Sequence, residues 1–189
     1  MLSPTTIIFV IITEQGLQYI SFFTATILNW KQLLLDDLYK DIIISSMKFL
    51  IADKRTVIYA FVIMPNHIHV VWKIANERKK EDVQRDFLKY TAQKMKLRLK
   101  DEDPEKLKSF YVGAKDRKYQ FWERNPLTSR LPSEELIVQK INYIHANPIR
   151  GKWNLCKEFT DYKYSSASFY YNESKEWGFL THYADAVDE

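Results

Sequence analysis

The sequence predicts a single domain of the α+β class. Two short runs rich in β-branched and aromatic residues, Val57–Ile63 and Ile68–Trp72, flank Met64-Pro65-Asn66, which is the pattern of two strands joined by a turn. Longer segments on either side of this hairpin place apolar residues three or four positions apart, as one face of a helix requires. A chain of 189 residues, 46% hydrophobic and 28% charged, can bury one sizeable core.

The first third of the chain is expected to contain an extension, a strand and a helix. Residues 1–16 are an N-terminal extension of uncertain structure, whose apolar run Ile7–Ile12 is too short to cross a bilayer. The β-prone segment Leu17–Ile27 predicts a strand, and residue 17 begins the single domain that extends to residue 189. In Leu34–Leu50 the three-to-four spacing of apolar side chains predicts a helix packed on one face.

The second half is expected to hold two more helices. Lys79–Lys100 predicts a long helix with an apolar stripe, which acidic residues and a proline end. Tyr119–Arg124 is a β-prone aromatic run followed by a turn. Ser133 is a suitable N-cap for a helix over Ser133–Asn147, because two glutamates occupy the first turn and Pro148 prevents continuation. The remaining C-terminal residues are expected to form irregular segments and short elements.

Composition narrows the class of protein. The single cysteine, Cys156, excludes an internal disulfide and fits a reducing cytosol, so the protein is expected to be cytoplasmic. No positive residue precedes Ile7–Ile12 and no small-residue cleavage site follows it, so we expect neither a signal peptide nor a membrane partner. A net charge of +4 and a pI near 8.9 are compatible with a polyanionic partner but do not establish one.

His67 and His69 are the first candidate site residues. They lie two apart on the second strand of the predicted hairpin, and alternate residues of a strand project from the same face. Two neutral imidazoles side by side supply half of a divalent-metal site. Paired histidines on a strand can equally pack or form hydrogen bonds, so the spacing alone leaves both interpretations open.

The predicted helix Ser133–Asn147 offers partners for such a cation. Tyr143 and Asn147 lie four apart and therefore share a helix face. A phenol can attack an electrophile and an amide carbonyl oxygen suits a hard cation, so the pair fits covalent catalysis on a phosphodiester. Tyr143 is also one of twelve tyrosines, and the spacing alone favours a packing role for it.

Three ordered blocks resemble the REP-associated tyrosine transposases, which belong to the HUH (His-hydrophobic-His) single-tyrosine nucleases of bacterial insertion sequences. The blocks are Ile63–Val71, Ile141–Arg150 and Tyr162–Ala167, and the resemblance extends from Leu17 to Tyr170. It implies the HUH endonuclease fold, a ferredoxin-like antiparallel β-sheet backed by α-helices. Residues 1–16 precede the first strand of the family pattern, and Asp101–Lys118 is a candidate insertion.

The resemblance also implies roles for individual residues. His67 and His69 match the two histidines that bind Mg²⁺ or Mn²⁺, Tyr143 matches the nucleophile, and Asn147 matches the third ligand. The implied activity is that of a metal-dependent single-stranded DNA endonuclease and strand transferase, a transposase that cleaves near hairpins through a 5′-phosphotyrosine intermediate. His145 lies off the face of Tyr143 and is expected to be structural.

Two other functions stay open at this point. One is a catalytically inactive hairpin-DNA-binding protein. The other is a metal-dependent hydrolase of small phosphoesters, which would need a water activator in place of Tyr143. Detection of a covalent protein–DNA adduct would separate the three, and the choice between a monomer and a homodimer is left open.

Cationic side chains supply the expected footprint for single-stranded or hairpin DNA. Single-stranded DNA is bound by cations along its backbone and by aromatic residues beneath its bases. Lys115 and Arg117 belong to the second of two basic clusters, while Trp122 within the same region is expected in the core. The first basic cluster lies on the predicted helix Lys79–Lys100, where a solvated helix face is the alternative interpretation. The side chains expected to contact DNA are Arg85, Lys89, Lys94, Lys96, Arg98, Lys118, Arg124 and Arg130.

Overall fold

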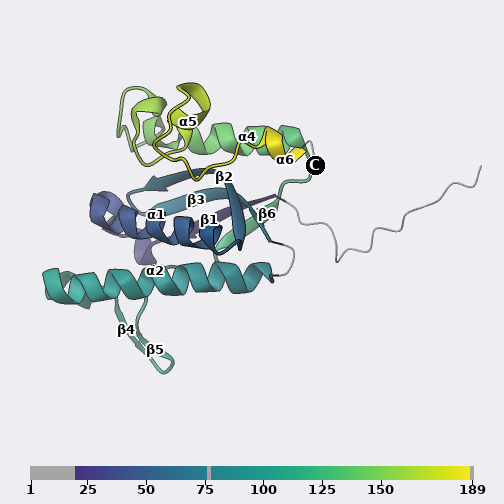
Figure 1. Ribbon diagram of the computed structural model, residues 1–189. Helices are drawn as coiled ribbons and strands as arrows, with labels where there is room; N and C mark the ends of the chain where they lie inside the picture. The colour runs from purple at the N-terminus through teal and green to yellow at the C-terminus, as the bar shows by residue number, and fades with distance from the viewer. Residues whose placement is uncertain (1–19, 76–77, 188–189) are drawn as a thin grey trace, which may run out of the picture.

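Four strands form one antiparallel sheet in the computed structural model, which describes residues 20–75 and 78–187 (Figure 1). The strand order is β2-β3-β1-β6. Helix α1 connects β1 to β2, and helix α2 lies between β3 and β6, so the β-α-β-β-α-β framework is ferredoxin-like, as predicted. The bounds are β1 Ser21–Thr26, α1 Asp37–Ala52, β2 Thr56–Met64, β3 His67–Ile74, α2 Lys80–Glu102 and β6 Leu127–Arg130.

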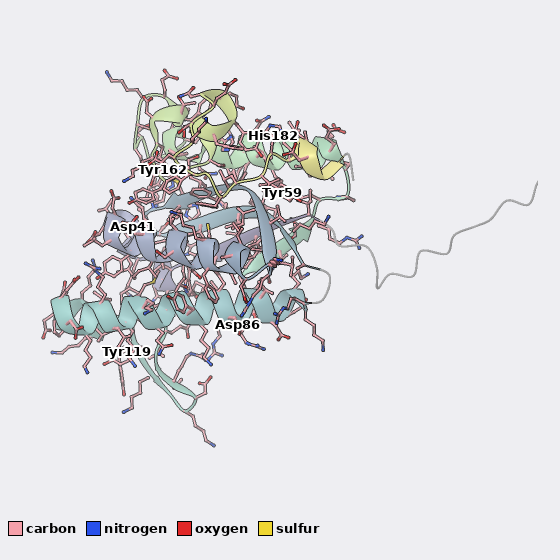
Figure 2. All side chains as sticks on the ribbon, viewed as in Figure 1. Asp41, Tyr59, Asp86, Tyr119, Tyr162 and His182 are labelled. Carbon is pink, nitrogen blue, oxygen red and sulfur yellow. The ribbon has the colours of Figure 1, made fainter. Side chains whose placement is uncertain are left out.

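Helices cover both faces of the sheet. Helices α1 and α2 pack side by side against one face, and α4 (Glu134–His145) packs against the other (Figure 1). Figure 2 shows Tyr59 and His182 on the α4 side and Asp86 and Tyr119 on the α2 side. The shorter elements are η1 Leu28–Trp30, η2 Leu33–Leu35, α3 Pro104–Lys108, β4 Tyr111–Ala114, β5 Arg117–Tyr119, η3 Asn147–Ile149, η4 Phe159–Asp161, α5 Ala167–Tyr171 and α6 Ala184–Val187.

The alternation of side chains along the strands separates the core into two layers. On β1, Phe23 and Ala25 face α1 and α2, whereas Phe22 and Thr24 face the opposite way. Strands β2 and β3 are buried on both faces, which explains why they are continuous apolar runs in the sequence. A register shift between Ile58 and Ala60 inserts one extra residue into β2.

The C-terminal segment covers the edge strand β2. Backbone hydrogen bonds join Ile63 N to Tyr164 O (2.9 Å), Ser166 N to Phe61 O (2.9 Å) and Thr181 N to Ile58 O (3.1 Å). An exposed strand edge invites pairing with other chains, and these bonds satisfy that edge from within the molecule. The sequence block Tyr162–Ala167 is therefore part of the structural cover of the sheet.

Several sequence predictions are confirmed with small shifts of their bounds. The predicted helices correspond to α1, α2 and α4, and the N-cap of α4 is Ser133, whose Oγ accepts from Leu136 N at 3.4 Å. The predicted hairpin corresponds to β2 and β3. The predicted extension 1–16, and the beginning of the strand predicted over Leu17–Ile27, lie outside the described residues.

The region after α2 differs from expectation. The aromatic run Tyr119–Arg124 is mostly irregular, because only its first residue belongs to β5 and Trp122 makes an isolated bridge to Ile27. Asp101–Lys118, the candidate insertion, forms the end of α2, helix α3 and most of a small hairpin of β4 and β5. In the described part of the chain, no helix is both long enough and apolar enough to cross a membrane.

Candidate functional site

His67 and His69 lie side by side on the face of the sheet that α4 covers. They belong to β3, where their partners in β1 are Thr26 and Thr24 and their partners in β2 are Met64 and Val62. Their ring centroids are 4.8 Å apart, and both side chains are almost entirely buried. The i, i+2 spacing on a strand thus produces the shared direction that the sequence predicted.

Each histidine uses one ring nitrogen in a hydrogen bond to the protein. Asn66 Nδ2 donates to Trp30 O at 3.2 Å, so Asn66 Oδ1 faces His67 and accepts from its Nδ1 at 2.7 Å. Thr24 Oγ1 lies 2.7 Å from His69 Nδ1 and can accept from it in the same way. With both Nδ1 atoms protonated, the Nε2 lone pairs are the ones available to a cation.

Burial keeps both imidazoles uncharged at neutral pH. Loss of solvation, with a smaller contribution from Lys152, lowers the pKa of His67 to about 4. Loss of solvation, followed by the effects of His67 and Lys140, lowers the pKa of His69 to about 3. Only a neutral imidazole can donate a lone pair to a metal ion, so both rings are in the protonation state that a cation would require.

Tyr143 projects from α4 towards the same place. Its ring meets the ring of His69 edge to face at 5.6 Å between centroids, and Phe22 of β1 lies 6.2 Å from it. Phe22 in turn stacks on His69 at 5.1 Å. The side chain is 42% exposed, so the phenol is open to a substrate and is not sealed in the core.

Asn147 takes part in a different contact from the one expected of a ligand. Its Nδ2 donates to Tyr143 O at 3.0 Å, one turn back along the chain. Among the described residues, no group of three or more His, Cys, Asp or Glu side chains could hold a metal ion. The role of Asn147 as the third metal ligand remains a prediction.

The donor set nevertheless fits a divalent cation. Two neighbouring Nε2 atoms supply two ligands, and a site with few protein ligands leaves positions for water and phosphate oxygen. A mixed set of imidazole nitrogen and oxygen donors suits Mn²⁺ as well as Mg²⁺. The predicted cofactors are therefore compatible with the side chains present.

His145 holds α4 to the edge of the sheet. Its Nε2 lies 2.8 Å from Ser166 Oγ, which also accepts from Phe61 N at 3.0 Å and donates to Phe61 O at 3.2 Å. The ring is buried, and burial lowers its pKa to about 4. The side chain therefore serves to position the helix that carries Tyr143.

Further side chains at the site escaped sequence reasoning. Lys140 Nζ is 5.0 Å from the ring centroid of Phe22 and 5.5 Å from that of Tyr143. Lys140 lies three residues before Tyr143, so the helical spacing could have found it. The sequence predicts only a turn residue at Asn66 and not its hydrogen bond to His67. The rings of Trp30 and Trp153 flank His67 at 6.4 and 6.2 Å, and neither carries a motif that would have revealed this.

The predicted DNA-contacting cations do not surround the histidines. Those on α2 lie on the helix layer that covers the opposite face of the sheet. Arg85 is paired with Asp82 and Asp86, and Arg98 with Glu102. The structure brings together Arg85, Lys89 and Arg124 around one cavity, and Lys94 and Arg98 beside a separate hollow. Lys96 lies over the ring of Tyr119, Lys118 is exposed on β5, and Arg130 ends β6.

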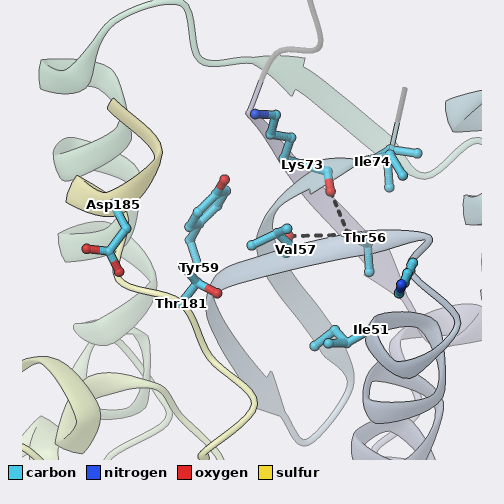
Figure 3. Close-up of a pocket in the computed structure, with 10 residues that line it drawn as sticks. Ile51, Thr56, Val57, Tyr59, Lys73, Ile74, Thr181 and Asp185 are labelled. Carbon is cyan, nitrogen blue, oxygen red and sulfur yellow. Dashed lines mark hydrogen bonds between the residues drawn. The ribbon is translucent and has the colours of Figure 1, made fainter. Parts of the chain in front are cut away.

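A hollow of about 380 Å³ lies at the end of β3 remote from His67 (Figure 3). Thr56, Lys73 and Asp185 are among its lining residues, and Thr56 Oγ1 donates to Lys73 O at 2.9 Å. Strand β3 runs from His67 to Ile74, and the hollow adjoins Ile74. It is therefore separate from the histidine site.

Comparison with known proteins agrees with the fold. No family model and no curated protein matches the chain. Nine chains of solved structures match. A REP-associated tyrosine transposase bound to a REP hairpin has 17% sequence identity and a TM-score of 0.61, with 88% of this chain and 85% of that chain covered. The two proteins share their fold.

A second solved structure is a protein from Deinococcus radiodurans R1 that is described as a candidate transposase. Its sequence identity is also 17%, its TM-score is 0.46, and the alignment covers 68% of this chain and 89% of that chain. At this TM-score the likeness adds nothing to the argument from geometry.

Proposed function

We propose that the chain is a metal-dependent transposase that cleaves single-stranded DNA beside a hairpin and holds the cut end on Tyr143. The observation that supports this most directly is the contact between the half-exposed Tyr143 ring and His69, next to His67. A hydroxyl that can act as a nucleophile and two neutral imidazoles that can bind a metal ion then lie side by side, with the phenol accessible to solvent. The shared fold with a transposase that was solved on a REP hairpin supports hairpin DNA as the substrate class.

His67 and His69 would hold the cation through Nε2, with Asn147 as the third protein ligand. When bound, a divalent cation neutralises and polarises the phosphodiester. Asn66 and Thr24 keep the two Nε2 atoms directed at that position through their bonds to Nδ1. Strand β3 and its two neighbours keep these side chains on one rigid surface.

Tyr143 would form the covalent intermediate. Its phenolate oxygen attacks phosphorus, the new oxygen–phosphorus bond forms, and the bond from phosphorus to the 3′-oxygen breaks. The phenol loses one proton to solvent, and the leaving 3′-oxygen takes up one proton. The products are a 5′-phosphotyrosine and a free 3′-hydroxyl, and attack by a second 3′-hydroxyl reverses the sequence and joins strands. The ammonium of Lys140, beside the ring of Tyr143, is available to pair with a phosphate oxygen.

The test is an adduct assay on a denaturing gel with a labelled hairpin that carries single-stranded flanks. The wild-type protein with Mn²⁺ should give a slowly migrating covalent adduct, and Tyr143→Phe should give none. Tyr90→Phe is the matched control, because Tyr90 has a similar exposure of 46% but lies on α2 across the sheet. An adduct that persists in Tyr143→Phe would place the nucleophile elsewhere.

The same gel decides between the proposed function and its alternatives. Hairpin binding with no cleavage by the wild type would indicate a catalytically inactive hairpin-binding protein. Cleavage without any adduct would indicate a water-activating phosphoesterase. Equal binding of a blunt duplex and of a flanked hairpin would argue against single-stranded DNA as the substrate.

A further inference from the structure

A groove lies on the outer surface of the molecule between α1 and α2, which pack side by side (Figure 1). The first half of α1 and the second half of α2 line a hollow of about 410 Å³ along it. The second half of α1 and the first half of α2 line another of about 180 Å³. Four large apolar side chains of these helices are 45–58% exposed, and they are Leu38, Phe49, Tyr90 and Leu97. An exposed apolar patch of this kind marks a surface that binds a partner.

Helix α1 carries apolar residues on two faces. Its inward face, with Ile43, Met47 and Leu50, packs in the core against the sheet. A second stripe runs along the groove with successive gaps of four, three and four residues, and it consists of Leu38, Ile42, Ser45 and Phe49. These gaps are those of a helix that packs lengthwise against another helix. The sheet accounts for the inward face of α1 but not for this second stripe.

Charged side chains change sign along the groove. Asp41 lines the larger hollow, and Lys48 follows seven residues later on the same side of α1. On α2, Asp86 lines the smaller hollow, whereas Lys94 and Arg98 line the larger one. Figure 2 shows Asp41 and Asp86 towards opposite ends of the helix pair. On each helix, the acidic residue therefore comes first along the groove and the basic residue comes second.

This order of charges makes the groove complementary to itself. A two-fold rotation about an axis across the middle of the stripe brings the first half of α1 over the second half of α1 in another copy. Leu38 then faces Phe49 of the second copy, and Asp41 faces Lys48 of the second copy. On α2, the same rotation brings the basic second half over the acidic first half. Such reciprocal contacts are what a symmetric dimer interface requires.

Nucleic acid is a poorer match for the groove. A phosphate backbone is bound by cations along its whole contact, whereas Asp41 and Asp86 line this groove together with exposed apolar side chains. A partner of a different sequence would not require the sign of the charge to reverse midway along both helices. The pattern therefore favours a second copy of the chain.

We propose that the groove between α1 and α2 is the interface of a symmetric homodimer, in which the outer stripe of α1 packs antiparallel against the same stripe of a second copy. The inference goes beyond the proposed function, which concerns the other face of the sheet. Because α4 and the histidines lie on that other face, each copy keeps its own site on the outer surface of the dimer.

The first experiment is sedimentation velocity of the full chain without DNA over a dilution series. The mass should rise with concentration from 22.6 kDa towards twice that value. Leu38→Glu and Phe49→Glu should each weaken the dimer at least about tenfold, because the dimer contains every substitution twice and buries the new carboxylates. Leu136→Glu is the matched control, because Leu136 is 37% exposed on α4, on the other side of the sheet. Thermal melting checks that each variant folds.

Charge reversal tests the antiparallel arrangement. Asp41→Lys and Lys48→Glu each place like charges opposite one another, so each variant alone should dimerise about tenfold more weakly. An equimolar mixture of the two should form a heterodimer as readily as the wild type dimerises, because every facing pair then has opposite signs. Native mass spectrometry identifies the heterodimer. Asp41 also accepts from the Tyr164 hydroxyl at 2.9 Å, and mixing would not restore the loss of that bond.

Each outcome decides the proposal. A mass of one chain at every concentration would overturn it, and weaker hairpin binding by Lys94→Glu in that case would assign the groove to DNA. Undiminished dimers of Leu38→Glu and Phe49→Glu would place the interface elsewhere and overturn it too. An equal loss in Leu136→Glu would attribute the effect to added charge and overturn the assignment.

The mixture decides the arrangement of the two copies. Failure of Asp41→Lys and Lys48→Glu to recover dimers when mixed would refute the antiparallel packing of α1 and with it the proposal. No DNA enters the mass measurements, so their failure leaves the proposed function to the adduct assay.

Discussion

The bond between Thr24 and His69 provides the sharpest test of the candidate metal site. Thr24→Val replaces the hydroxyl by a methyl group of similar size and keeps a β-branched residue in β1. His69 Nδ1 then loses its partner at 2.7 Å, and the His69 side chain is itself almost entirely buried. The neutral ring can shift its proton to Nε2, which is the atom that the cation needs.

The expected loss of metal affinity in Thr24→Val follows from the free-energy cost of moving that proton. Removal of a partner that orients a metal-ligating histidine typically weakens metal binding about 10- to 100-fold, which is about 1.4 to 2.7 kcal/mol. The unpaired Nδ1 also lowers the free energy of unfolding by about 1–3 kcal/mol. A stability in the ordinary range of about 5–15 kcal/mol would leave the variant folded.

The assay is calorimetric titration of Mn²⁺ into the full chain without DNA, so it does not depend on cleavage. Thr24→Ser, which retains the hydroxyl, should restore the affinity of the wild type. Unchanged Mn²⁺ affinity in Thr24→Val would refute the reasoning. An equal loss in Thr24→Ser would show that packing around β1, and not the hydrogen bond, controls the site.

Three further predictions concern the neighbouring groups. Asn66→Ala should weaken Mn²⁺ binding by a similar factor, since His67 Nδ1 loses its acceptor; an unaltered titration would contradict the tautomer argument. Excess EDTA should abolish the adduct but preserve hairpin binding, measured by fluorescence anisotropy of a labelled hairpin, and cleavage in EDTA would remove the metal from the mechanism. The lowered pKa of His145, about 4 against 6.5, means that the unfolded chain takes up a proton between these values that the folded chain does not. The contribution of neutral His145 to the free energy of unfolding should therefore be fully present above pH 6.5 and be lost as the pH falls towards 4. In His145→Gln, the decrease in the free energy of unfolding between pH 7 and pH 5, measured by urea unfolding, should be smaller by about 2 kcal/mol. If the wild type and His145→Gln lose stability identically as the pH falls, His145 does not remain neutral in the folded protein.

Sequence periodicity was sufficient for the helices and the central hairpin. Apolar spacing specified α1, α2 and α4 because each buries one stripe against the sheet. Strand β6 was missed because Leu127–Arg130 is short, largely exposed and bounded by no apolar alternation. Tyr119–Arg124 has strand composition, yet its aromatic side chains line a cavity instead of extending the sheet.

Only part of the candidate site can be predicted from the sequence. The spacing of His67 and His69 gave their common direction, and the helical position of Tyr143 gave its face. Thr24 and Trp30 belong to segments far away in the chain, so only the pairing of β1 with β3 and the loop after β1 bring them to the histidines. The cations of α2 could not be assigned to a face of the sheet, because helical charge runs give no information on which layer the helix joins.

The attachment of α4 to β2 through His145 and Ser166 has a consequence for the number of chains that the proposed reaction would need. Tyr143 sits two residues from that attachment and lies over the histidines of its own sheet. Tyr143 and the two histidines that the proposed function assigns to the cation thus belong to one chain, so under that proposal strand cleavage is expected to be first order in protein. A chain without its tyrosine and a chain without its histidines could not complement each other when mixed, and strand exchange between two DNA ends would have to bring together two complete sites.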